Sequence, residues 1–286
     1  MKTSFIAFVC LLISISVFAM KPLLPIRFDI SKMEIVDYTD IHIYYAFNAI
    51  DINNPETYID LQRLEIGTVI SKYFSYYILN NDSLGVDFAK KNPRAQSRPR
   101  ILGWAGRESF YWSEYQYSEY FKDFTKKTLT EYTRMPHSLN KFNCQSKETI
   151  PNQNWKVEAG AMTIAGYSCK KATCTFRGRN YTAWFTTDIP INNGPFKFGG
   201  LPGLILKVYD NDKLYTFECI KIERFKEKKP IMRNEIYKEY KESDRKSLLK
   251  LQKEIHENFA DLAGWVNADG SPIENKEPPY HALELE

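Results

Sequence analysis

Residues 182–205 read TAWFTTDIPINNGPFKFGGLPGLI. This stretch begins and ends in two segments, 181–185 and 204–209, that are rich in aromatic and aliphatic residues and are typical of β-strands. Its glycines permit positive φ angles, whereas its prolines fix φ and remove a backbone donor. The sequence therefore predicts a strand, then a loop that is sharply bent at some points and stiff at others, and then a second strand.

Two interpretations of this loop remain open. A stiff, sharply bent loop suits a surface that binds a ligand or a partner protein. It equally suits a structural corner in which Phe196 and Phe198 fill the core. No phosphate-binding loop is expected, because no Gly-Lys-Ser/Thr follows the glycines. The candidate binding residues are Trp184, Phe185, Asp188, Pro190, Gly194, Pro195, Phe196, Phe198, Gly200, Leu201, Pro202 and Gly203.

The rest of the chain predicts many strands followed by one helix. Apolar residues alternate over 41–47, as in a half-buried strand. Residues 234–259 lack Gly and Pro and carry a helical apolar stripe at Leu248, Leu251, Ile255 and Phe259. This order favours a mainly β fold with a curved antiparallel sheet covered by a C-terminal amphipathic helix. Further strands are expected at 58–66, 70–79, 127–134, 141–147, 162–176 and 213–225, and a short helix is possible within 111–124.

The first residues have the pattern of a secretory signal peptide. A basic start is followed by an apolar run over 4–18 and by the small-residue site at Ala19. A membrane anchor is a weaker interpretation, because this run is shorter than the twenty or so apolar residues that a span requires. We expect a signal peptide at 1–19, an antiparallel β domain at 20–230, and a C-terminal helix with an extended tail at 231–286. The mature protein is then exported to the periplasm or the outer cell envelope, or secreted.

Charge and cysteine content narrow the class of protein. The net charge of +4 becomes +3 once Lys2 is removed with the signal peptide, which is too weak for a nucleic-acid-binding protein. Four cysteines remain, and in an oxidising compartment they are candidates for one or two disulfides. No metal site is expected, because there is no Cys-x-x-Cys motif and no nearby histidine. The disulfide candidates are Cys144, Cys169, Cys174 and Cys219.

No catalytic motif is visible. The chain has four histidines, His42, His137, His256 and His281, and no second histidine lies four residues from His256. There is no Gly-x-Ser-x-Gly elbow, although a Ser–His–Asp set assembled only by the fold stays possible. No enzyme activity and no cofactor are therefore expected. Aromatic residues are the better binding candidates, and Trp104, Trp112, Tyr115 and Tyr117 form a second cluster that lines a groove or fills the core.

Several motifs resemble the GLPGLI family of exported Bacteroidota proteins, whose biochemical activity is not established. The signature itself is Gly200-Leu201-Pro202-Gly203-Leu204-Ile205. The similar stretches are 64–83, 155–157, 164–172, 177–185 and the closing Glu284-Leu285-Glu286. The resemblance implies export, and by analogy it implies a half-open barrel like those of the lipoprotein carriers LolA and LolB.

Three functions are consistent with these observations. The first is a non-enzymatic cell-envelope protein that binds an apolar ligand, a peptide or an outer-membrane partner. The second is an accessory component of an outer-membrane transport or surface assembly system, docking through the 188–203 loop or the 234–259 helix. The third is a hydrolase with an unrecognised site.

Overall fold

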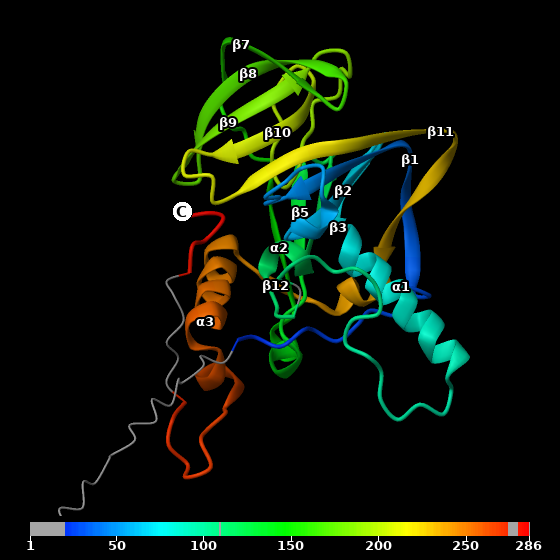
Figure 1. The fold of residues 1–286 in the computed structure, drawn as a ribbon, viewed down its shortest axis with the longest axis vertical. Coiled ribbons are helices and arrows are strands. Elements are labelled where there is room, and N and C mark those ends of the chain that lie inside the picture. Colours follow the sequence, from blue (N-terminus) through cyan, green and yellow to red (C-terminus); the bar gives the residue numbers. More distant parts are fainter. Residues whose placement is uncertain (1–20, 109, 274–279, 286) are drawn as a thin grey trace, which may run out of the picture.

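The computed structural model describes residues 21–108, 110–273 and 280–285. Within these ranges, the strands form one open twelve-stranded sheet in the order β12-β6-β5-β4-β3-β2-β1-β11-β10-β9-β8-β7 (Figure 1). All neighbouring strands run antiparallel except β12 and β6, which are parallel. The predicted mainly β fold with a curved antiparallel sheet is confirmed at this level, whereas the predicted signal peptide lies outside the described residues.

The elements follow one another closely along the chain. The strands are β1 (Met33–Phe47), β2 (Asp60–Gly67), β3 (Ile70–Ser75), β4 (Ser118–Asp123), β5 (Thr128–Thr133), β6 (Cys144–Thr149), β7 (Lys156–Ile164), β8 (Tyr167–Phe176), β9 (Arg179–Thr186), β10 (Leu204–Asp210), β11 (Thr216–Asn234) and β12 (Lys241–Ser243). The α-helices are α1 (Tyr76–Lys91), α2 (Glu114–Tyr117) and α3 (Arg245–Ala263), and short 3-10 turns occupy Pro55–Thr57, His137–Phe142 and Glu235–Glu239.

The central pair of strands, β1 and β11, joins the two halves of the sheet. Their register runs from Met33 opposite Asn234 to Phe47 opposite Phe217. Three register shifts interrupt this pairing, and such irregularities increase the local twist and bend of a strand. Strand β11 also continues across residue 230, where we placed a boundary, so residues on both sides of 230 share one sheet.

The loop over residues 188–203, which we call the signature loop, fills the space that the curved sheet encloses. The Phe196 ring lies 5.0 Å from that of Tyr120 on β4, and the Phe198 ring lies 4.8 Å from that of Tyr181 on β9. Five strands separate β4 from β9 in the sheet order, so the loop must cross the hollow of the sheet to touch both. This face is therefore occupied by the protein's own phenylalanines, unlike the open face that the LolA/LolB analogy implies.

Two helices differ from the sequence-based expectation. Strand β3 ends at Ser75, whose side chain caps α1 by accepting a hydrogen bond from the Ile78 amide. The expected strand over 70–79 thus becomes a helix at Tyr76, because the cap offsets the poor helix propensity of the aromatic and Asn residues that follow. Likewise, α3 begins at Arg245 rather than Asn234, because Asp244 provides its N-cap.

The apolar stripe of α3 packs against the rest of the protein. Leu248, Ile255 and Phe259 are buried with Trp112 and Leu139 in a second hydrophobic cluster. This helix is consequently part of the folded core, and its apolar face is not a free docking surface. In the described part of the chain, no helix is long and apolar enough to cross a lipid bilayer.

Candidate functional site

The structure buries most of the candidate residues of the signature loop. Trp184, Phe185, Gly194, Pro195, Phe196, Phe198, Leu201 and Gly203 are buried, whereas Asp188, Pro190, Gly200 and Pro202 are exposed. The loop therefore has the structural role of a core plug, and only its outer turns offer a surface. A shallow hollow of about 480 Å³ lies beside Pro190, Ile191 and Asn192 and is also lined by Tyr38.

A buried ion cluster ties this loop to the C-terminal segment. Lys197, which is 2% exposed, lies 3.0 Å from Glu131, 3.5 Å from Glu148 and 2.9 Å from Glu284. Glu284 is also paired with Arg245 at the start of α3, at 2.9 Å. Burial alone would raise the pKa of Glu284, but Lys197, Arg177 and Arg245 together hold it below its ordinary value. The closing residues are thus fixed to the loop by charge as well as by packing.

The four cysteines are free thiols in the structure. Cys169 and Cys219 are buried in the main core, and Cys144 is buried in the second cluster beneath α3. Burial raises the pKa of Cys169 to about 11 and that of each of the other three thiols to about 12. The predicted disulfides are therefore not formed here, and in this state the cysteines act as small apolar residues.

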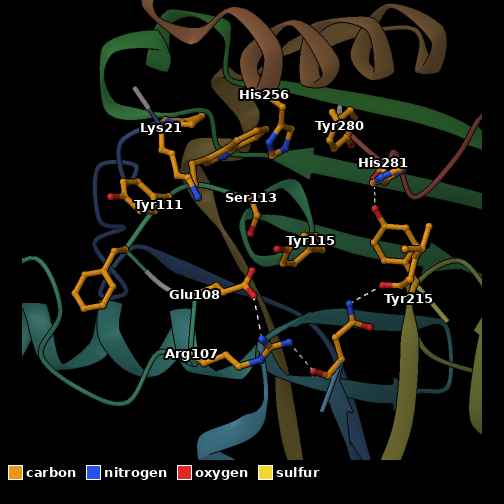
Figure 2. A pocket seen from close by; sticks show the side chains of 15 residues that line it. Lys21, Arg107, Glu108, Tyr111, Ser113, Tyr115, Tyr215, His256, Tyr280 and His281 are labelled. Atoms are coloured by element: carbon orange, nitrogen blue, oxygen red, sulfur yellow. Dashed lines mark hydrogen bonds and ion pairs between the residues drawn. The ribbon is translucent and has the colours of Figure 1, made fainter. Parts of the chain in front are cut away.

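A separate cavity lies between α3, the 107–115 segment, the β10–β11 turn and the last residues of the chain (Figure 2). We call it the aromatic cleft. Its volume is about 520 Å³, within the range of roughly 300–1,000 Å³ that is usual for small-molecule sites. Its lining residues are Lys21, Pro22, Asn48, Arg107, Glu108, Phe110, Tyr111, Trp112, Ser113, Tyr115, Leu214, Tyr215, His256, Tyr280 and His281.

Hydrogen bonds between distant segments hold the cleft walls. The Trp112 amide donates to the Pro22 carbonyl, and its indole donates to the Arg134 carbonyl at 2.6 Å. Arg107 donates from Nε to the Thr57 carbonyl at 3.0 Å, and its Nη1 pairs with Glu108 at 3.1 Å. The walls are therefore positioned before any ligand arrives.

One wall is organised by Glu114, the first residue of α2. One of its carboxylate oxygens lies 2.7 Å from His256 Nε2, and the other accepts a 2.7 Å hydrogen bond from the Tyr280 hydroxyl. The His256 and Tyr280 rings stack on one another with centroids 4.2 Å apart, and Figure 2 shows His256 extending from α3 with Tyr280 below that helix. Although burial alone would raise the pKa of Glu114, His256 and the two hydrogen bonds hold it below its ordinary value. This carboxylate thus fixes α2, α3 and the C-terminal segment together.

The cleft does not contain an assembled nucleophilic triad among the residues that the structure describes. Ser113 lies beside Glu114, but its hydroxyl donates to Gln116 Oε1 at 3.0 Å and not to His256. Nor do the described residues include a group of three His, Cys, Asp or Glu side chains that could hold a metal ion.

Sequence reasoning found part of this site and missed the rest. Of the four aromatic residues predicted to line a groove or fill the core, Trp112 and Tyr115 line the cleft and Trp104 is exposed. Tyr117 does not line the cleft and is buried in the hydrophobic cluster beneath α3. Residues from six separate segments meet at the cleft, so no local spacing indicated it. The one local signal was the run of aromatic residues at 110–112.

The fold is that of a mainly β protein with one large open sheet, and the aromatic cleft is a cavity beside α3. A family described as "N-glycanase peptide, N-terminal domain" matches residues 113–248. Two solved structures, "Structure of PNGF-II in P21 space group" and "Structure of PNGF-II in C2 space group", are each similar at 15% identity, with TM-scores of 0.44 and 0.46. They cover 76% and 74% of this chain, which spans only about a third of their length (33% and 32%). The sequence matches none of the curated proteins with which it was compared.

Proposed function

We propose that this chain is an exported cell-envelope protein of the GLPGLI type that binds a ligand in the aromatic cleft without transforming it. The observation that carries this proposal is the cleft itself, a cavity of about 520 Å³ with six aromatic side chains in its lining. Aromatic walls with a few fixed polar groups are typical of ligand sites. The predicted signal peptide at 1–19 supports export.

The position of the cleft changes the ligand-binding hypothesis that the sequence suggested. The analogy with lipoprotein carriers implied an open hollow inside the sheet. In this protein the same space is a core packed around Phe196 and Phe198. The proposed binding site is instead outside that core, between α3 and the C-terminal segment. Of the candidate residues of the signature loop, the exposed ones that stay available for a partner are Asp188, Pro190, Gly200 and Pro202.

A second candidate is an accessory role in a larger assembly, and one observation favours it. Strand β7 is the last strand of the sheet and pairs on one side only, with β8. Its residues Val157 and Met162 are 54% and 37% exposed. Such an edge accepts an added strand from a partner. The family match to an N-terminal domain is in line with a module that works beside another one.

Native mass spectrometry of the mature protein, purified gently from its own envelope, tests the first proposal. A bound small molecule that is lost when the cleft is altered supports ligand binding. A ligand-free protein that co-purifies with another polypeptide favours the accessory role, and an empty monomer that binds no small molecule contradicts ligand binding. Mass spectrometry of the same sample also shows whether cleavage occurred after Ala19.

A further inference from the structure

The lining of the aromatic cleft is unusual for a site that would bind an acyl chain. Six of its fifteen residues are Phe, Tyr or Trp, and only Pro22 and Leu214 are aliphatic. The remaining seven carry charged or polar groups, namely Lys21, Asn48, Arg107, Glu108, Ser113, His256 and His281. A hydrocarbon ligand would cover these polar groups without offering them hydrogen bonds, which is costly. The ligand should therefore be polar around its edge and apolar on its faces.

Two aromatic rings are available at the mouth of the cleft. Phe110 is 68% exposed and Tyr111 is 44% exposed, and Figure 2 shows Tyr111 beside Lys21 at one side of the opening. The Lys21 ammonium lies 5.3 Å from the centre of the Tyr111 ring. The faces of aromatic rings carry partial negative charge and attract the partly positive C–H groups of an apolar ligand face. A pyranose ring has such a face.

The polar groups suit a ligand that both donates and accepts hydrogen bonds. Arg107 and Lys21 donate, and Glu108 accepts. His256 is tied to Glu114 through Nε2, and its side chain is 21% exposed. Sugar hydroxyls are donors and acceptors at once, so they can satisfy both kinds of group. Because Arg107 and His256 are already held in place, binding costs little side-chain ordering.

We propose that the aromatic cleft binds a saccharide, with Tyr111 and Phe110 stacking on sugar ring faces and with His256 and Arg107 hydrogen-bonding its hydroxyls. This inference rests on the proposed function, because it names the ligand class of the same site. The cleft accommodates a short oligosaccharide whose remaining units extend past the exposed rings into solvent. Tyr111 is the residue on which affinity depends most without contributing to the core.

The test is a printed array of neutral and acidic oligosaccharides, followed by calorimetric titration of the strongest binder. We expect Tyr111→Ala and Phe110→Ala to weaken binding of that oligosaccharide at least tenfold. Both side chains are largely exposed, so each variant should keep the melting temperature of the parent protein, and that measurement confirms folding. Tyr38→Ala, at a position 48% exposed beside the signature loop, should change affinity less than twofold.

The outcomes separate this inference from the proposed function. If native mass spectrometry detects a lipid or a peptide that Tyr111→Ala releases, and the array is silent, the cleft binds a ligand but the saccharide inference is wrong. If an oligosaccharide binds and Tyr38→Ala weakens it while Tyr111→Ala does not, the sugar site lies beside the signature loop instead. If neither experiment finds a ligand, both proposals fail.

Discussion

Lys197 Nζ lies 2.9 Å from a carboxylate oxygen of Glu284, and each side chain is only 2% exposed. One residue belongs to the signature loop and the other to the last three residues of the chain. Glu131 and Glu148 complete the cluster around the same ammonium. A buried charge of this kind is tolerated only while all its partners are present.

Lys197→Met should therefore destabilise the protein strongly. It removes the ammonium that three carboxylates share, and although Glu284 keeps Arg245 and Glu148 keeps Arg177, Glu131 loses its cation. Removing one partner of a buried ion pair typically costs about 3–5 kcal/mol. Urea denaturation followed by circular dichroism measures the free energy of unfolding. The matched control is Lys126→Met, because Lys126 is 72% exposed in its pair with Asp123 and such pairs contribute about 0–1 kcal/mol. Equal effects of the two substitutions would contradict a stabilising role for the cluster.

The C-terminal segment offers a second comparison within three residues. Leu283 is 5% exposed and belongs to the main core, whereas Leu285 is 56% exposed. We expect Leu283→Ala to lower the free energy of unfolding by about 2–4 kcal/mol, as is usual for a buried leucine. Leu285→Ala should change it by less than about 0.5 kcal/mol. Thermal unfolding of the two variants gives the answer, and similar melting temperatures would show that the segment does not pack as described.

The signature glycines differ in what a side chain would meet. A Cβ on Gly203 would lie 2.0 Å from the Thr186 carbonyl oxygen, which is backbone and cannot move aside. At Gly199 the nearest atom would be 3.4 Å away, an ordinary contact. Gly203→Ala should thus lower stability by at least about 2 kcal/mol because the loop must shift, and Gly199→Ala should lower it much less. Loss of soluble expression for Gly203→Ala alone, or a lower unfolding midpoint, would agree with this contact.

His42 should make the protein less stable in mild acid. Burial lowers its pKa to about 4, with Arg63 and Lys229 acting in the same direction and Glu223 opposing them. Glu65 lies 3.6 Å from His42 Nε2 but is itself paired with Arg63 at 2.5 Å. Because the unfolded state binds the proton near pH 6.5 and the folded state only near pH 4, stability falls as the pH drops through this window.

Comparing the parent protein with His42→Gln measures how much His42 contributes to the loss of stability in mild acid. Solvent screening limits the His42 contribution to about 1–2 kcal/mol. The difference in unfolding free energy between the two proteins should therefore shift by that amount between pH 6.5 and pH 4, in favour of the variant at the lower pH. A constant difference across the window would show that His42 is already free to take up a proton in the folded state.

Thiol chemistry tests the state of the cysteines. Because all four are free and their pKa values are raised by burial, the folded mature protein should react slowly with iodoacetamide at pH 8. After unfolding in guanidinium without reductant it should take up four equivalents, as measured by intact mass. Uptake of only two or none would show that disulfides form in the envelope, as the sequence suggested.

The sequence predicts the strands better than it predicts the site. The alternation over 41–47 and the paired segments around the signature loop correspond to β1, β9 and β10. Residues 41–47 are nevertheless buried on both faces of the sheet, whereas their alternation predicted a half-buried strand. The helix α1 was missed, because a single cap at Ser75 decides its start against the preference of the following aromatic residues. The cleft was found only through Trp112 and Tyr115, since its other walls come from separate segments spread along the chain from Lys21 to His281.

The pairing of β1 with β11 has a consequence for how the chain comes to be folded. Met33 lies opposite Asn234, so the first strand to emerge during synthesis or export stays without its neighbour on that side until some two hundred further residues have followed. Contacts between such distant residues form slowly, and an unpaired strand exposed in the meantime is prone to aggregate. Until β11 has been made, β1 pairs only with β2 of the β1–β2–β3 meander. The edge of β1 that later pairs with β11 is a place where a chaperone or a holding factor would bind.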